Sequence, residues 1–174
     1  MNNGSGDEWS VVFTVGGAFI RVFDHESAMT PYRDPVHQLW PGLLDGLPAV
    51  LRPQVEEPAF GDEEGRFVAT AVLWRLAGDD RWRAGEHIAF PQPRGAYDTD
   101  PDGSGLLEIL LDDIADRYVS FAQDHHEVDV DPRAVEHVVA HRPLTDVVVR
   151  ALNAEATVSG LYEDVAAIGY PIAA

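Results

Sequence analysis

Residues 9–23 read WSVVFTVGGAFIRVF, and this stretch decides the fold class. Two runs rich in Val, Phe and Ile, which favour strands, flank the pair Gly16-Gly17. A two-residue glycine link between such runs is typical of a β-hairpin, because glycine adopts the positive φ angles of a tight turn. We therefore expect antiparallel strands at residues 9–15 and 18–23.

The next strands are expected on either side of a turn at residues 77–80. Residues 66–76 and 81–90 are the candidates. The Ala and Leu content of the first also fits a helix, but its Trp, Val, Phe and Thr favour a strand. Between the hairpin and these strands, residues 24–60 contain six prolines, which exclude one long straight helix.

The second half of the chain has helical periodicity. Apolar side chains recur at i, i+3, i+4 spacing along residues 106–123, which predicts one continuous amphipathic helix. Further helices are expected from Pro132, behind the N-cap candidate Asp131, and at residues 145–152 and 159–168. Strands first and helices last indicate an α+β fold, with N-terminal antiparallel hairpins and the C-terminal helices packed on one face of the sheet.

The length of 174 residues fits a single domain over residues 1–174. We expect residues 1–8 to be frayed, residues 9–90 to form mainly strands and loops, and residues 106–174 to form mainly helices. The start of the chain lacks the basic and apolar regions of a signal peptide. No apolar run reaches the roughly 18 residues of a membrane span, so we expect a cytoplasmic protein without a membrane partner.

The composition excludes several classes of chemistry. The chain has no Cys, which removes disulfides, thiol nucleophiles and Cys-type zinc sites. All 12 basic residues are Arg, so lysine-dependent chemistry is excluded as well. The usual dinucleotide, serine-hydrolase and zinc-protease motifs are missing. We therefore expect no cofactor.

The net charge of −18 bears on partners and on the host. A strongly acidic surface repels nucleic acid and anionic membranes, and it favours a basic protein as partner. The abundance of Ala, Val, Gly, Pro, Arg and Asp, with no Lys, indicates a high-GC bacterium. A halophilic host is the alternative explanation for 30 acidic residues against 12 basic ones.

An acidic loop at residues 98–108 has part of a calcium-binding pattern. Asp98, Asp100 and Asp102, followed by Gly103, match the first positions of an EF-hand loop. The bidentate glutamate at position 12 is missing in this register and in the one that starts at Asp100. We expect an acidic turn before a helix, with no calcium binding in the micromolar range.

Histidines provide a second set of candidate metal ligands. His137 and His141 have the i, i+4 spacing that would place two imidazoles on one helix face. His125 or Glu127 could supply a third ligand. Histidines exposed to solvent are the simpler interpretation, so we expect no metal at either the histidines or the acidic loop.

Two Trp-Arg pairs, Trp74-Arg75 and Trp82-Arg83, flank the turn. Gly78-Asp79 fits a two-residue type II′ loop, which would place Trp74 opposite Arg83 and Arg75 opposite Trp82. Arginine beside tryptophan can form a stacking surface for a planar ligand. More often such pairs cover one side of a sheet.

The segments LWRLAGDDRWRAG at residues 73–85 and HRPLT at residues 141–145 resemble an uncharacterised actinobacterial protein family of unknown function. The resemblance covers a minor part of the chain. It implies no activity, ligand or site.

Our functional hypothesis is a non-catalytic binding or regulatory protein that meets a basic protein partner. In a continuous helix, Glu108, Asp112 and Asp116 align at i, i+4 spacing with Asp113 beside them, forming an acidic stripe for that partner. The alternatives are a small hydrolase or metal-dependent enzyme, which would use the acidic loop or the histidines, and a structural subunit.

Overall fold

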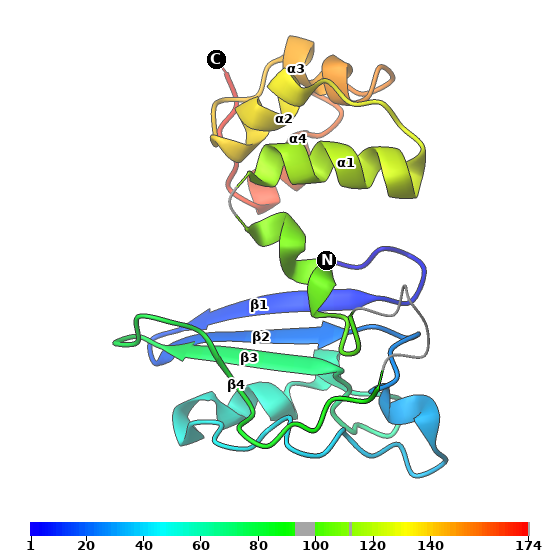
Figure 1. Cartoon of the computed structure of the whole chain (residues 1–174). Helices are drawn as coiled ribbons and strands as arrows, with labels where there is room; N and C mark the ends of the chain where they lie inside the picture. The colour runs from blue at the N-terminus through cyan, green and yellow to red at the C-terminus, as the bar shows by residue number, and fades with distance from the viewer. Residues whose placement is uncertain (93–99, 112, 174) are drawn as a thin grey trace. The chain divides into compact units, whose positions relative to one another are not determined.

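The computed structural model describes residues 1–92, 100–111 and 113–173. Residues 1–107 and 108–174 form two compact units. An antiparallel sheet lies in the first half of the chain and helices lie in the second (Figure 1), which confirms the α+β class. None of the described helices is long and apolar enough to cross a membrane. The expectation of a single domain stays a prediction.

The first hairpin is confirmed, with its turn shifted by one residue. Strand β1, Glu8–Thr14, pairs antiparallel with β2, Gly17–Phe23, and Thr14 faces Gly17. The turn is therefore Val15-Gly16, and not Gly16-Gly17. Gly17 is the first residue of the second strand. Its φ of 145° and its close approach to the next strand both require glycine at this position. A Cβ there would collide with the carbonyl oxygen of Arg75.

The second hairpin is confirmed in register but not in its turn or length. Strand β3, Ala71–Leu76, pairs with β4, Arg83–Ala84, and Trp74 lies opposite Arg83 as expected. The type II′ loop at Gly78-Asp79 is wrong. Asp79 N donates to Leu76 O at 3.0 Å, so Ala77 and Gly78 are the central residues of the turn, and Gly78 lacks the positive φ of a type II′ turn.

The strand expected over residues 81–90 ends at Ala84. Beyond it, Gly85 packs so closely on Gly42 that a Cβ would collide with the Gly42 carbonyl oxygen. Further along, Ala89 O accepts a hydrogen bond from Trp40 Nε1 at 3.1 Å. These contacts draw the chain toward the proline-punctuated segment and away from β3, which explains why β4 has only two residues.

The sheet, in the order β1-β2-β3-β4, carries apolar clusters on both faces. Short 3₁₀ helices lie below the sheet in Figure 1, namely η1 (Pro31–Arg33), η2 (Ala49–Glu56) and η3 (Pro58–Phe60). On one face Phe19 and Trp74 pack with Leu51 of η2, and all three are almost fully buried. On the other face Ile20 and Val22 pack together. The alternation along β2 follows from the two-residue period of a strand.

The expected continuous helix over residues 106–123 is wrong. A 3₁₀ helix, η4 (Ser104–Leu110), precedes a separate helix, α1 (Ile114–His126). Between them Asp113 has the left-handed conformation, with φ of 70°. A left-handed residue cannot continue a right-handed helix, and a 3₁₀ helix turns every three residues instead of every 3.6. The apolar spacing was compatible with one helix, but it does not encode this break.

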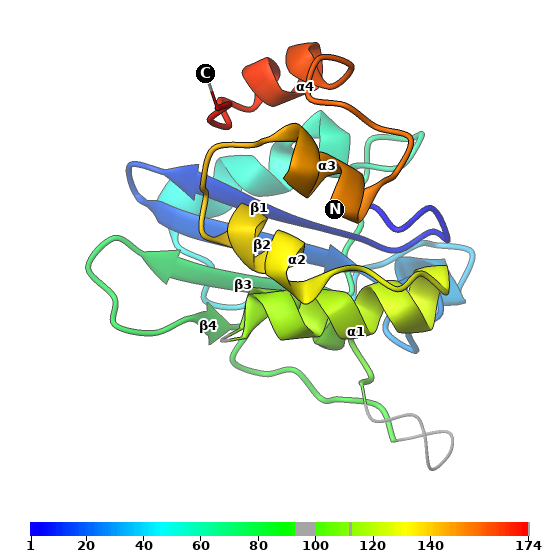
Figure 2. The same ribbon diagram turned by 90° about the horizontal axis from the view of Figure 1, so that it is seen from above.

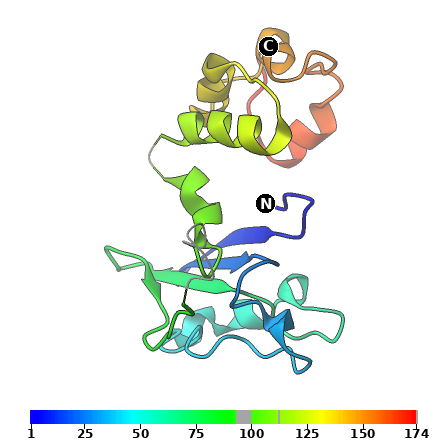
Figure 3. The same ribbon diagram turned by 45° about the vertical axis from the view of Figure 1, so that its right-hand side comes forward.

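The remaining helices lie where they were expected. They are α2 (Pro132–Val139), α3 (Asp146–Leu152) and α4 (Tyr162–Ala167), seen from two sides in Figures 2 and 3. The Asp131 side chain caps α2 by accepting from Arg133 N at 2.9 Å. Their shared core is small, with Leu144, Val149 and Val165 as its buried members.

Candidate functional site

Two residues of the candidate sets, Asp98 and Asp112, lie outside the described residues. The others can each be located, and their hydrogen bonds and burial show what each side chain can do.

The acidic loop before η4 uses its carboxylates to close its own backbone. Asp100 Oδ2 accepts from Gly105 N at 2.7 Å, and Asp102 Oδ1 accepts from Ser104 N at 3.0 Å. Burial raises the pKa of Asp100, and the nearby Asp102 adds to this, although the hydrogen bond from Gly105 opposes it. Within the described residues, no group of three potential ligands includes Asp100 or Asp102. The arrangement is that of a turn preceding a helix.

His137 and His141 do not share a helix face, contrary to the expectation from their spacing. His137 lies in α2, and its Nε2 is 2.9 Å from Pro143 O. His141 follows the end of α2 with φ of 52°, and its ring centroid lies 4.6 Å from that of Tyr170. Because the helix ends at Val139, the i, i+4 rule does not apply to this pair.

The third histidine candidate lies on a different helix. His125, in the last turn of α1, stacks on Phe121 with ring centroids 5.0 Å apart. Glu127 terminates the helix with φ of 54°. The groups of three potential ligands in the described part of the chain include none of these residues.

The acidic partner-binding candidates do not form one helical stripe. Glu108 lies in η4, where its Oε2 accepts from Arg117 Nη1 at 3.1 Å. Asp113 is the left-handed residue ahead of α1, and Asp116 is exposed in the first turn of α1. The i, i+4 alignment is wrong because the helix is broken, and Asp116 is the candidate that α1 itself presents.

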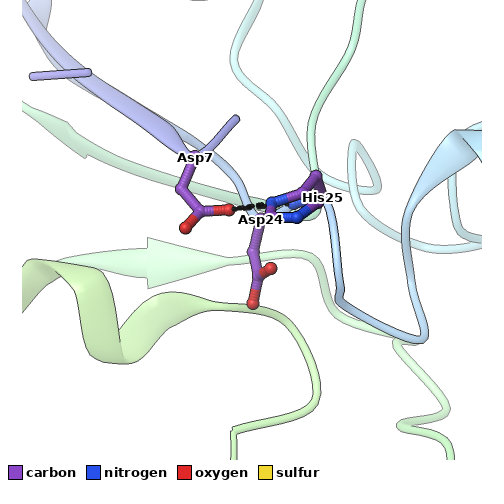
Figure 4. Close-up of side chains that lie close together, drawn as sticks. All are labelled: Asp7, Asp24 and His25. Carbon is purple, nitrogen blue, oxygen red and sulfur yellow. Dashed lines mark hydrogen bonds and ion pairs between the residues drawn. The ribbon is translucent and has the colours of Figure 1, made fainter. Parts of the chain in front are cut away.

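A cluster that the sequence interpretation missed joins Asp7, Asp24 and His25 (Figure 4). Asp7 Oδ1 lies 2.7 Å from His25 Nδ1, and Asp7 Oδ2 accepts from Asn3 Nδ2 at 2.7 Å. Asp24 Oδ1 accepts from Glu26 N at 2.8 Å, which closes the turn after β2. Most of the potential ligand atoms are therefore engaged in hydrogen bonds that fix local structure.

The charge states of this cluster follow from those contacts. Burial alone would raise the pKa of Asp7, but the hydrogen bonds from His25 and Asn3 outweigh it and lower that pKa. The hydrogen bond to Asp7 raises the pKa of His25. Burial raises the pKa of Asp24. The contact thus favours protonated His25 beside ionised Asp7, with Asp24 next to the pair.

A second acidic group, around Asp62, is also occupied by ion pairs. Arg66 Nη2 lies 2.7 Å from both Asp62 Oδ2 and Glu64 Oε2, and His37 Nδ1 is 2.7 Å from the same guanidinium nitrogen. Burial opposes the shift, yet the hydrogen bonds from Arg66 lower the pKa of Asp62. An arginine at the centre of the group disfavours a bound cation.

The Trp-Arg segment borders a cavity of about 450 Å³ within residues 1–107. Three stretches of chain that are separate in the sequence line it, and they include Gly46, Trp74, Asp79, Arg81, Trp82 and Glu86. A volume of this size lies in the range of small-molecule sites. The Trp-Arg pairs were the sequence signal, but the meeting of the three stretches depends on long-range contacts that no local pattern encodes.

No protein-family model, no curated protein and no solved structure matches this chain.

Proposed function

We propose that this chain is a non-catalytic, cytoplasmic binding protein that meets a basic protein partner through residues 108–174. The observation that carries the proposal is the surface of α1, which presents both exposed apolar side chains and exposed carboxylates. Carboxylates and histidines outside α1 serve turns, ion pairs and ring contacts, which supports binding over catalysis.

Two sets of side chains make up this surface of α1. Ile114 and Tyr118 are 37% and 38% exposed, and Phe121 continues their row at i, i+4, i+7 spacing. Asp124 adjoins this row at i, i+3 from Phe121, whereas Asp116 lies on another part of the helix circumference, and both are exposed. A basic segment with one or two apolar side chains would match the apolar row and Asp124, because apolar contact supplies affinity and charge supplies orientation and on-rate. Asp116 adds to the long-range attraction.

The charge of the helical unit supports the same partner. Residues 108–174 contain 13 Asp and Glu against four Arg, a net charge of −9. Residues 1–107 contain 17 against eight, also −9, spread over a longer segment. The helical unit therefore has the higher density of negative charge, and it attracts a basic partner more strongly per unit of surface.

The test uses an amphipathic Leu/Arg peptide as the probe, titrated into the full chain at low salt and followed by calorimetry. The double variant Asp116→Asn/Asp124→Asn should weaken binding roughly fivefold, since two exposed ion pairs contribute about 0.5 kcal/mol each. The weakening should shrink as salt rises, because exposed charges are screened beyond about 10 Å at 0.1 M. Tyr118→Ser should weaken binding by an amount that salt does not change.

The matched control is Glu163→Gln/Asp164→Asn on α4, which removes the same charge from the same unit. If both double variants weaken the peptide equally, only net charge matters and the α1 surface is not the site. Stoichiometric zinc or calcium in protein purified without an affinity tag would instead favour the metal-dependent enzyme.

A further inference from the structure

One wall of the cavity beside β3 is formed by a side chain of the packed core. Trp74 is only 2% exposed and packs into the core with Phe19 and Leu51, yet it also lines the cavity. Its indole N–H has no hydrogen-bond acceptor in the described part of the chain. The N–H is not among the fully buried polar atoms, so it is accessible to an acceptor on a ligand in the cavity.

Asp79 holds the loop that forms the rim. Its Oδ2 accepts from Leu76 N and from Arg83 Nε, both at 3.2 Å, and its backbone oxygen accepts from Arg75 Nε at 2.8 Å. The hydrogen bond from Arg83 lowers the pKa of Asp79, so both groups stay charged and neutralise each other. The turn is thereby held in place before any ligand arrives, which reduces the entropy lost on binding.

The side chains of Arg81 and Trp82 on this loop are available to bind a ligand. Arg81 is exposed and makes no hydrogen bond or ion pair within the described residues. Trp82 is 38% exposed, and both side chains line the cavity. A guanidinium binds a carboxylate through two parallel hydrogen bonds, and an indole face stacks on a planar ring.

We propose that this cavity binds a small planar aromatic acid with a single carboxylate. Arg81 binds the carboxylate, the ring stacks on Trp82, and a carboxylate oxygen also accepts from the Trp74 N–H. This site is independent of the α1 surface proposed above, because all its residues belong to the first unit.

The remaining charges set the number of anionic groups that the ligand carries. Asp79 is neutralised by Arg83, so the cavity offers one free cation, Arg81, among its described lining residues. Glu86 adds a carboxylate to the same lining, and its negative charge acts on Arg83. A second anionic group on the ligand would meet Glu86 and the field of a chain of net charge −18. Monoanions are therefore favoured over dianions and polyanions.

The experiment titrates naphthalene-2-carboxylate into the full chain, with calorimetry for affinity and NMR for the indole N–H signals. We expect saturable binding with Kd of about 1 mM or tighter, as a ligand of this size allows. The indole N–H signal that Trp74→Phe removes should be the one that shifts. Naphthalene-2-carboxamide should bind about tenfold more weakly, since it lacks the charge.

Arg81→Gln should weaken the carboxylate about tenfold and leave the carboxamide unchanged. Arg52→Gln is the matched control, because Arg52 is also exposed and unpaired within the described residues but does not line the cavity. It should leave both affinities unchanged. Failure to saturate, equal effects of the two Arg variants, or tighter binding of naphthalene-2,6-dicarboxylate would overturn the proposal. None of these outcomes depends on the basic partner of α1.

Discussion

At the scale of single residues, Asp7 and His25 shift each other's pKa, and their contribution to stability therefore depends on pH. Their side chains lie 2.7 Å apart, and the pair lowers the pKa of Asp7 and raises that of His25. The His25 contribution to stability is complete below its unfolded pKa of about 6.5 and is lost as pH rises through the folded value. The Asp7 contribution is complete above about 3.9 and is lost as pH falls through its folded value.

Replacing Asp7 tests this pair directly. Asp7→Asn removes the carboxylate, so the pKa of His25 should fall toward its usual value of about 6.5 in an NMR titration of the imidazole ring. Asp45→Asn removes the same charge beside a different histidine, His87, and should leave His25 unchanged. An unaltered His25 titration in Asp7→Asn would show that the contact does not persist in solution.

At the scale of elements, the end of α1 contains a residue type poorly suited to its backbone. Glu127 has the left-handed conformation, while Val128 N reaches back to Ala122 O at 3.2 Å. Glycine is favoured at this position, so Glu127→Gly should stabilise the chain by about 0.5 kcal/mol in urea unfolding. Glu136→Gly, at an exposed position inside α2, should destabilise it by about 1 kcal/mol. The same loss of stability in both variants would refute the assignment of this helix end.

The same elements show what local sequence patterns can and cannot predict. The β1–β2 hairpin and α2 follow from strand-forming residues around glycine and from an Asp-Pro cap, which act over a few residues. The break at Asp113 was missed because the apolar spacing is similar in an α helix and in a 3₁₀ helix followed by one. The cavity and the Asp7–His25 pair were missed because they join residues that are distant in sequence.

At the scale of the whole molecule, the two compact units have separate cores of unequal size. The described residues of 1–107 form two buried clusters around the sheet, whereas those of the helical unit have Leu144, Val149 and Val165 as their buried cluster. A small core provides little stability beyond the entropy lost on folding. The helical unit should therefore be the less stable of the two.

Spectroscopic probes can separate the units without cutting the chain. All four Trp residues lie in residues 1–107, whereas α1 to α4 lie in residues 108–174. In urea, helical circular dichroism should be lost at a lower concentration than the tryptophan fluorescence signal of the folded state. Val149→Ala, at a buried position, should destabilise the helical unit by about 2 kcal/mol and move only the first transition. Coincident transitions that Val149→Ala shifts together would instead establish one cooperative domain, because a two-state unit gives the same midpoint with every probe.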